Sequence, residues 1–375
     1  MSWLVYRLSG SVVLLATVNF MAQIPILLIT PFVSVYVDRF DRRKILLLTQ
    51  TLSMVQALAL ALLALTGIIQ IWHILLLSFS IGCINALDNP TRQAFYPGLV
   101  AKEHLSNAIA LNSAVINSSR LIGPAIGGLL IGLCGEGLCF LLNGLSYIGI
   151  ITALLAMHPQ PSVPRNHPLH LRTDLSEGFQ YISGHTPIRT LLLFICVISF
   201  FGLPLTTFIP AYVKDILHAG SEELGLLLSC SGIGSFGAAL YLAGRKEVAG
   251  LWKVISTSGI LLSIGLIGIS SVETIPIAAC IYIAIGFTLI SAVASVNTLL
   301  QTLSDEAKRG RVMGYLAMAF TGLPPIGSLF LSSLEKYTGL PVIILISGVG
   351  CILGSIVFEY YRTKMSRFVR HIPSL

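Results

Sequence analysis

Charged side chains are scarce in this sequence. Only 10% of its 375 residues are Asp, Glu, Lys or Arg, whereas about 25% is usual for a soluble domain. The apolar residues Ala, Val, Ile, Leu, Met, Phe, Trp, Tyr and Cys make up 55% of the chain. With so few charges to solvate its surface, such a chain would aggregate in water. The composition excludes a soluble enzyme, a disordered chain and a secreted disulfide scaffold, and it indicates an all-α polytopic membrane protein.

Long polar stretches are also rare. Apolar runs follow one another along the chain, and each reaches the roughly 20 residues that a membrane-spanning helix needs. The single long polar stretch, 158–188, has four prolines between residues 159 and 168, followed by a short amphipathic segment. We predict eleven spans, at residues 12–37, 45–66, 71–90, 106–132, 137–157, 189–213, 222–243, 251–270, 274–297, 312–334 and 339–360.

The polar stretch divides the chain into two parts. We interpret 158–188 as a cytoplasmic linker between an N-terminal transmembrane half, 1–157, and a C-terminal transmembrane half, 189–361. A basic tail follows at 362–375. If the loop at 38–44 is cytoplasmic, 19 of the 23 Lys and Arg residues lie in cytoplasmic loops and in this tail. The positive-inside rule then predicts a cytoplasmic carboxyl terminus, and it explains the net charge of +7 without a nucleic-acid partner.

Sequence signatures of enzymes and metal sites are missing. No metal-ligand spacing, His-Glu-x-x-His motif or Gly-x-Ser-x-Gly motif occurs, so we expect no metal, no cofactor and no enzymatic activity. Gly232-x-Gly234-x-x-Gly237 matches a dinucleotide fingerprint letter for letter. Because it lies within an apolar helix and follows no strand, we predict close helix packing there instead.

An internal repeat is visible in the sequence. Gly123-Pro-Ala-Ile-Gly-Gly-Leu-Leu130 and Leu323-Pro-Pro-Ile-Gly-Ser-Leu-Phe330 match at Pro, Ile, Gly and Leu with an offset of 200 residues. Such repeats are typical of transporters built from two related halves. The repeat predicts that the span at 189–213 has a partner that would begin before Met1. Residues 1–9 would then be the end of a first span, and the chain would hold about 11 of 12 helices.

Charge gathers in the loop after the first predicted span. Asp38, Arg39, Arg42 and Arg43 lie within six residues, and Asp88 ends the span 71–90. A carboxylate and several guanidinium groups can pair with one another and with helix ends, and this favours a network between helices. The alternative is that these arginines only set the orientation of the chain in the membrane.

One cation lies inside a predicted span. Arg120 would cost about 2.5–3.5 kcal/mol near the centre of a membrane, so such residues usually face a cavity or a partner. Helical spacing places Ser113, Asn117, Arg120 and Pro124 in one polar stripe, which leads into a Gly-Pro and Gly-Gly region. The alternative to a cavity role is that the Arg120 side chain reaches the membrane interface. Together the candidate cavity residues are Asn112, Ser113, Asn117, Arg120, Gly123, Pro124, Gly127 and Gly128.

Carboxylates that could carry protons are few. Asp88, Glu136 and Glu359 lie only at the ends of predicted spans, and the second half has no charge near mid-membrane. The sequence therefore does not identify a proton carrier.

Several of these stretches resemble the major facilitator superfamily, and most closely its enterobactin-exporter-like branch of transmembrane secretion effectors. The loop motif departs from the family at Ser34, where the family has Gly, and by this resemblance we expect residues 1–9 to match only the end of the family's first helix. The earlier glycines of the family's exporter motif are replaced by Ala110 and Ser119. The stretches that carry the resemblance are 3–11, 38–44, 88–95, 105–113, 120–128 and 309–314.

The resemblance implies a fold and a function. It implies two pseudo-symmetric helical halves and proton-driven export of a siderophore-like or amphipathic drug-like small molecule by alternating access. The transporter would be a monomer in the bacterial inner membrane, with protons as coupling ion. By resemblance the charged loop network latches the outward-facing state, and the Arg120 stripe contacts an anionic substrate or controls leakage. The alternative is a truncated, non-transporting membrane paralogue or scaffold.

Overall fold

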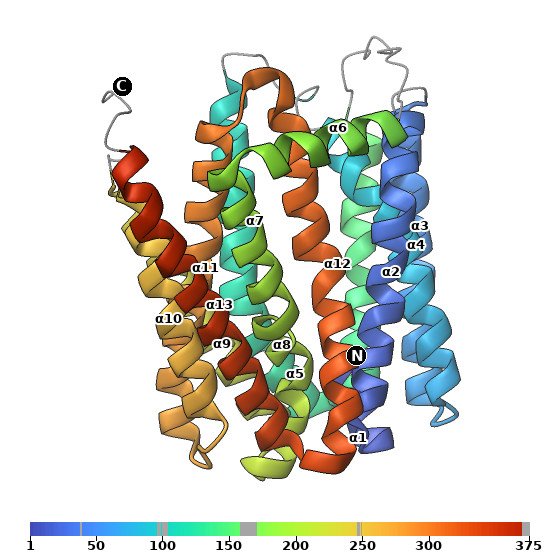
Figure 1. The fold of residues 1–375 in the computed structure, drawn as a ribbon. Coiled ribbons are helices and arrows are strands. Elements are labelled where there is room, and N and C mark those ends of the chain that lie inside the picture. The colour runs from blue at the N-terminus through green and yellow to red at the C-terminus, as the bar shows by residue number, and fades with distance from the viewer. Residues whose placement is uncertain are drawn as a thin grey trace. The chain divides into compact units, whose positions relative to one another are not determined.

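The computed structural model describes residues 1–37, 40–95, 99, 104–157, 171–245, 248 and 250–369. Every regular element among them is helical, with no strand in these ranges. Figure 1 shows long helices, as expected for chains that must satisfy every backbone polar group within the membrane. The predicted all-α polytopic fold is confirmed.

The chain separates into two compact units. Unit 1 comprises Met1–Leu169 and His218–Gly225, and unit 2 comprises His170–Leu217 and Leu226–Leu375. Unit 1 contains α1 (Ser2–Ser9), α2 (Val12–Val37), α3 (Arg42–Leu65), α4 (Ile71–Phe95), α5 (Leu105–Ala156) and the first residues of α9 (Ser221–Ala243). Unit 2 contains α6 (Leu171–Gly184), α7 (Thr186–Val197), the π-helix η3 (Ile198–Gly202), α8 (Leu205–Ala211), the π-helix η4 (Tyr212–Ile216), the rest of α9, α10 (Leu251–Ile269), α11 (Ile275–Leu303), α12 (Glu306–Thr338) and α13 (Leu340–Val369).

Ten helices among the described residues are long and apolar enough to cross a membrane. The sequence predicts eleven, and the difference lies in α5, which contains both predicted spans 106–132 and 137–157. Gly135 has φ 79° and ψ 167° inside α5, so helical geometry is interrupted there. Only glycine reaches this backbone region without a Cβ clash. We therefore describe α5 as two helical limbs joined at Gly135.

A second glycine ends the short helix α1. Gly10 adopts a left-handed conformation with φ 59°, and its N–H donates to the carbonyl oxygen of Tyr6 at 2.9 Å. This arrangement is a helix C-cap, and it explains why α1 ends at Ser9.

Small residues bring helices close together in both units. In unit 1 α2 packs along α4, and a Cβ built on Gly82 would lie 2.5 Å from the carbonyl oxygen of Ala22. In unit 2 α9 crosses α11, where a Cβ on Gly234 would lie 1.9 Å from the carbonyl oxygen of Ile283. Side chains larger than hydrogen would separate these backbones. The close-packing interpretation of the Gly232–Gly237 segment is therefore confirmed for Gly234.

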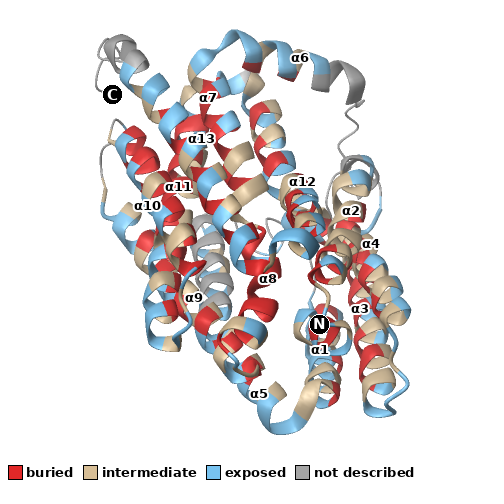
Figure 2. Ribbon diagram, turned by 60° about the horizontal axis from the view of Figure 1, so that its bottom comes forward, coloured by how far each residue is buried: buried red, intermediate tan, exposed pale blue. Residues whose placement is uncertain are grey.

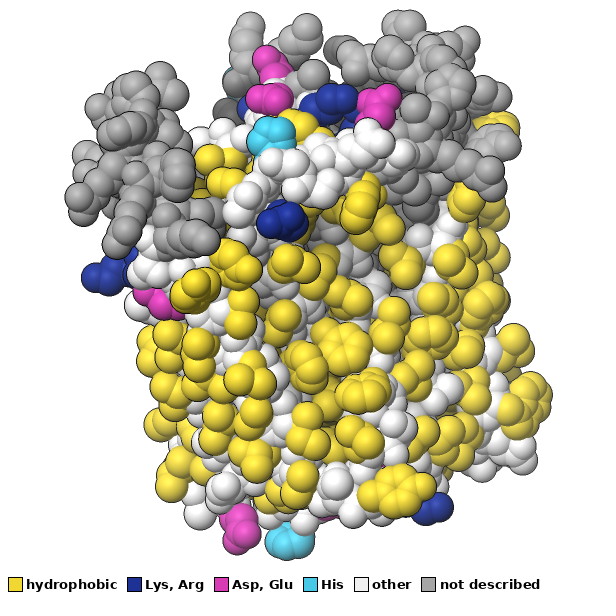
Figure 3. Space-filling view, viewed as in Figure 1, with side chains coloured by type: hydrophobic (Ala, Val, Ile, Leu, Met, Phe, Trp, Pro, Cys, Tyr) yellow, Lys and Arg dark blue, Asp and Glu magenta, His cyan; other side chains and the backbone are white. Residues whose placement is uncertain are grey.

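Burial follows the faces that the helices turn toward one another. Figure 2 shows buried residues, in red, alternating with intermediate and exposed residues along helices α10, α11 and α13, which pack against one another. On the face seen in Figure 3, hydrophobic side chains cover the middle and charged side chains lie toward the two ends. Exposed apolar residues include Leu62 and Leu133, at 64% and 70% exposure. Such a surface suits lipid and not water.

Candidate functional site

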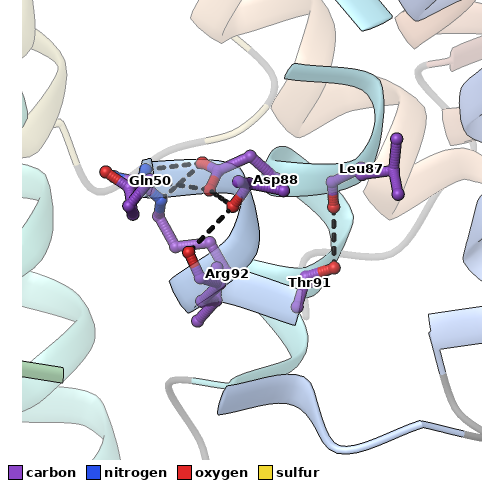
Figure 4. A network of polar contacts seen from close by, with 7 residues as sticks. Gln50, Leu87, Asp88, Thr91 and Arg92 are labelled. Carbon is purple, nitrogen blue, oxygen red and sulfur yellow. Dashed lines mark hydrogen bonds and ion pairs between the residues drawn. The ribbon is translucent and has the colours of Figure 1, made fainter. Parts of the chain in front are cut away.

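A buried carboxylate lies near the carboxyl end of α4 in unit 1. The Asp88 side chain is 5% exposed. The Thr49 hydroxyl and the Gln50 amide each donate to Asp88 Oδ1 at 2.7 Å. Arg92 donates to Oδ2 from Nε at 3.1 Å and from Nη2 at 2.5 Å (Figure 4). Because a buried carboxylate is costly unless it is paired and hydrogen-bonded, these three partners make the position of Asp88 stable.

The local sequence of α4 explains much of this geometry. Arg92 follows Asp88 by four residues, which places both side chains on the same helix face. Pro90 has no N–H, so the carbonyl oxygen of Ala86 loses its helical donor. Thr30 of α2 donates to that oxygen at 3.5 Å, and this adds a polar link between α2 and α4.

The arginines at the start of α3 bind the ends of two other helices. Asp41 is the N-cap of α3 and accepts a hydrogen bond from the Arg43 N–H at 2.9 Å. Arg42 Nη1 donates to the carbonyl oxygen of Ala94 in α4 at 2.9 Å. Arg43 donates to the carbonyl oxygens of Leu154 and Leu155, at 2.7 and 2.5 Å. A cation at a helix carboxyl end satisfies free carbonyls and complements the helix dipole.

Three of the five predicted network residues therefore join helix ends in unit 1. Asp88 joins α4 to α3, Arg42 joins α3 to α4, and Arg43 joins α3 to α5. The other two, Asp38 and Arg39, lie outside the described residues. The role of the network as a latch stays a prediction.

Sequence reasoning missed the direct partners of Asp88. Arg92 had a signal, because it lies four residues after a carboxylate in the same helix. Asp41, the N-cap of α3, was also missed although it had a sequence signal, because Asp directly before a helix is a favoured N-cap. Thr49 and Gln50 had none, because their contacts depend on how α3 packs against α4.

The predicted stripe of α5 is described in part. The backbones of Ser113, Asn117 and Arg120 are helical, but their side chains lie outside what the structure describes, so their roles stay predictions. Asn112 is half-buried.

The glycines that follow the stripe have different surroundings. A Cβ on Gly128 would lie 2.5 Å from the carbonyl oxygen of Ser221 and 2.8 Å from Gly225 Cα, in the segment His218–Gly225 of the same unit. Pro124 also lies against Gly225, while Gly123 and Gly127 face open space. Gly128 is thus a packing residue, and Gly123 and Gly127 are free to face lipid, solvent or a ligand.

The two other carboxylates at span ends are each paired with an arginine. Arg7 donates to Glu136 Oε1 at 2.7 Å in unit 1. In unit 2, Glu359 of α13 accepts from Arg362 Nε at 2.7 Å, from Arg362 Nη2, and from the Ser256 hydroxyl of α10. Among the described residues, no group of three or more His, Cys, Asp and Glu side chains could hold a metal ion.

Two proteins of similar sequence are named as transporters of staphyloferrin A and of enterobactin. The chain is 25% identical over 367 residues to the staphyloferrin A transporter of Staphylococcus aureus (strain NCTC 8325 / PS 47), with 97% of this chain and 91% of that protein covered. It is 28% identical over 351 residues to the enterobactin exporter EntS of Shigella boydii serotype 18, with coverages of 91% and 81%.

Solved transporters share the fold at low sequence identity. A bacterial homologue of the human lysosomal transporter Spinster, inward-facing and occupied, superposes with a TM-score of 0.70 at 14% identity, covering 97% of both chains. A bacterial homologue of the iron transporter ferroportin, inward-facing, superposes with a TM-score of 0.70 at 16% identity, covering 96% of this chain and 93% of that one. These likenesses concern the fold alone.

The model of one protein family spans almost the whole chain. It matches residues 1–374 and describes transmembrane secretion effectors. The match agrees with the ten apolar helices and with the transporters of similar sequence. The chain therefore belongs to the transmembrane secretion effector family of the major facilitator superfamily, and it is a multi-pass membrane transporter of small molecules.

Proposed function

We propose that the chain is a proton-driven exporter of a siderophore-like or amphipathic small molecule, working by alternating access in the bacterial inner membrane as a monomer. The observation that carries the proposal is the similarity to the staphyloferrin A transporter over 97% of this chain. The similarity to enterobactin exporters over 91% of the chain supports export as the direction. The carboxyl terminus is cytoplasmic in this proposal, because the basic loops lie on that side.

The charged network of unit 1 is the latch in this scheme. Asp88, Arg42 and Arg43 connect one end of α3 to the ends of α4 and α5. Alternating access needs two arrangements of the helices, each stabilised by contacts that the other lacks. Charge-assisted contacts at helix ends suit this role because each contributes about 1.5–3 kcal/mol and can be replaced by water when it opens. Asp38 and Arg39 complete the latch by prediction.

Arg120 is the proposed contact for the anionic part of the substrate. A guanidinium binds the two oxygens of a carboxylate through two parallel hydrogen bonds, and its charge survives at any physiological pH. In a low-dielectric cavity such a cation would attract an anion more strongly than it would in water.

An efflux assay tests the proposed function. The chain is produced in a bacterial strain without its own siderophore exporter, and efflux of a catecholate and of a citrate-based siderophore is followed separately. Efflux of one of them is expected, together with its loss when a protonophore collapses the proton gradient. Efflux that persists without a gradient would contradict proton coupling, and no efflux of any tested compound would contradict export of this class.

The Arg120→Ala variant tests the substrate contact in the same strain. Export should be lost while the protein still reaches the membrane at the wild-type level. Arg120→Lys is the matched control, because it keeps the charge and loses the paired hydrogen bonds, so it should retain part of the export. Wild-type efflux in Arg120→Ala would remove Arg120 from the mechanism.

A further inference from the structure

The amphipathic helix α6 is fastened to the start of α12 within unit 2. Glu177 Oε2 accepts a hydrogen bond from Lys308 Nζ at 3.0 Å and pairs with Arg311 Nη1 at 2.6 Å. One carboxylate oxygen thus binds two cations from the first turns of α12. Arg311 belongs to the motif Arg309-Gly-Arg-Val-Met-Gly314.

Further contacts place the same face of α6 on α12. A Cβ built on Gly178 would lie 3.1 Å from Tyr315 Cε2, so a larger residue there would require the Tyr315 ring to shift by a few tenths of an ångström. The Tyr181 hydroxyl accepts a hydrogen bond from the Asp305 N–H at 3.1 Å. Asp305 is the N-cap of α12, and its own N–H needs a partner outside the helix. Glu177, Gly178 and Tyr181 follow helical spacing, which makes one docking face.

The other end of α6 is joined directly to α7. His185 separates the two helices, and its ring nitrogen Nδ1 hydrogen-bonds with the carbonyl oxygen of Tyr181 at 2.8 Å. Arg189 of α7 donates to the carbonyl oxygen of Ser183 at 3.3 Å. Only His185 separates α6 from α7, and two hydrogen bonds cross the junction, so the orientations of the two helices are coupled. Figure 1 shows α6 crossing the end of α12 at a steep angle.

The contact at Glu177 is electrostatic and accessible to water. The side chains of Glu177, Lys308 and Arg311 are 43%, 34% and 27% exposed. The hydrogen bond from Lys308 and the charges of Arg311 and Lys308 hold the pKa of Glu177 below its ordinary value. Partly exposed pairs of this kind are screened and weak, so thermal motion can open and close them.

We propose that Glu177 is a positioning residue that reversibly fastens α6 to Lys308 and Arg311 and thereby fixes the start of α12 relative to α7. The inference deepens the proposed transport function and rests on it for the transport readout alone. Glu177 lies on α6, which is not one of the ten helices long and apolar enough to cross a membrane, and we assign it no contact with substrate. Its effect is on the rate at which the start of α12 moves. The Arg309–Gly314 motif supplies Arg311, one of the two cations that Glu177 binds.

Hydrogen exchange of the full chain in lipid nanodiscs measures the fastening directly. Glu177→Gln keeps the shape of the side chain and removes its charge. Exchange should rise about threefold in α6 and in the first two turns of α12, which is the loss of one weak ion pair. Glu306→Gln is the matched control, because it removes a charge from the first turn of α12, and the described part of α6 shows no contact with that side chain. Its exchange in α6 should equal that of the wild type.

A charge exchange separates the pair from a general loss of structure. Glu177→Lys alone places three cations together and should raise exchange further. Combining Glu177→Lys with Lys308→Glu restores one carboxylate between two cations, so exchange in α6 should return toward the wild-type value. Failure of the combined variant to restore it would overturn the pairing.

Transport kinetics give the readout that a merely structural contact would not move. In Glu177→Gln the maximal export rate should fall about threefold while the half-saturating substrate concentration stays unchanged. Unchanged exchange in α6 overturns the proposal, and so does raised exchange with an unchanged maximal rate. If the wild type exports nothing, the proposed function fails, and exchange at the start of α12 still decides whether Glu177 fastens it.

Discussion

Units 1 and 2 each contain a carboxylate that is bound in the same way but buried to different extents. Asp88 pairs with Arg92 four residues later and accepts from Thr49 of a neighbouring helix. Glu359 pairs with Arg362 three residues later and accepts from Ser256 of a neighbouring helix. The Asp88 side chain is 5% exposed, whereas that of Glu359 is 34% exposed.

From this difference we expect burial to decide how much such a contact contributes to the free energy of unfolding. Asp88 has lost nearly all its water, so each missing partner leaves an unpaired polar group in a low-dielectric site. Glu359 keeps access to water, which replaces a lost partner and screens the pair. We therefore expect unit 1 to depend on its carboxylate much more than unit 2 does.

Removing the buried carboxylate should have the largest effect. Asp88→Ala removes the acceptor of the buried Gln50 amide, whereas the Thr49 hydroxyl can still donate to the carbonyl oxygen of Leu46, and the free energy of unfolding should fall by about 3 kcal/mol. Denaturant unfolding in detergent micelles measures it, with Asp41→Asn as the control because asparagine also caps a helix. A loss no larger than that of the control would show that burial of Asp88 has no energetic consequence.

The second arginine of α3 should matter less than Asp88. Arg43→Ala removes two hydrogen bonds to the carboxyl end of α5, and these carbonyls can be partly solvated. The free energy of unfolding should fall by about 1.5 kcal/mol. Hydrogen exchange should rise at the end of α5 and stay unchanged at the end of α4, which Arg42 holds. Equal changes at both ends would mean that the two arginines act as one unit.

The corresponding change in unit 2 should be smaller again. Glu359→Gln keeps the side chain shape and the Ser256 hydrogen bond but loses the ion pair with Arg362. Because the pair is partly exposed, the free energy of unfolding should fall by only about 0.5–1 kcal/mol. The same micelle titration applies. A loss equal to that of Asp88→Ala would refute the comparison between the units.

A change of pH should give the smallest effect, at Glu177. Its pKa is lowered when it is docked, because Lys308 and Arg311 favour the carboxylate. Docking is therefore fully stabilised at pH values above the ordinary pKa of Glu, and this stabilisation is lost as the pH falls through the lowered value. Spin labels at Gln180 and Arg309 should report a constant distance near neutral pH and a longer one in acid. Lengthening near neutral pH would contradict this sign.

Several features could be predicted from local sequence. The positions of the spans follow from hydrophobic runs, and those predictions agree with the helices except where Gly135 interrupts α5. The close approach at Gly234 follows from small residues in an apolar helix. Asp88 and the two arginines of α3 could be chosen as polar residues at helix ends.

Other features were beyond local reasoning. Thr49, Gln50 and Ser256 resemble many other polar residues of the spans, and only packing selects them as partners of a carboxylate. Glu177 lies in a polar segment whose charges resemble those of a solvated helix. Its two cations follow in the sequence more than a hundred residues later.

Membrane residence, helical structure and the placement of charges at span ends depend on residues near one another in the chain. These features can be predicted from the sequence because hydrophobic length and helix formation are local properties. The partners of Asp88, Glu359 and Glu177 depend on which helices lie side by side and in what register. A shift of one residue turns a side chain by about 100° on a helix of 3.6 residues per turn, so only the tertiary structure selects those partners.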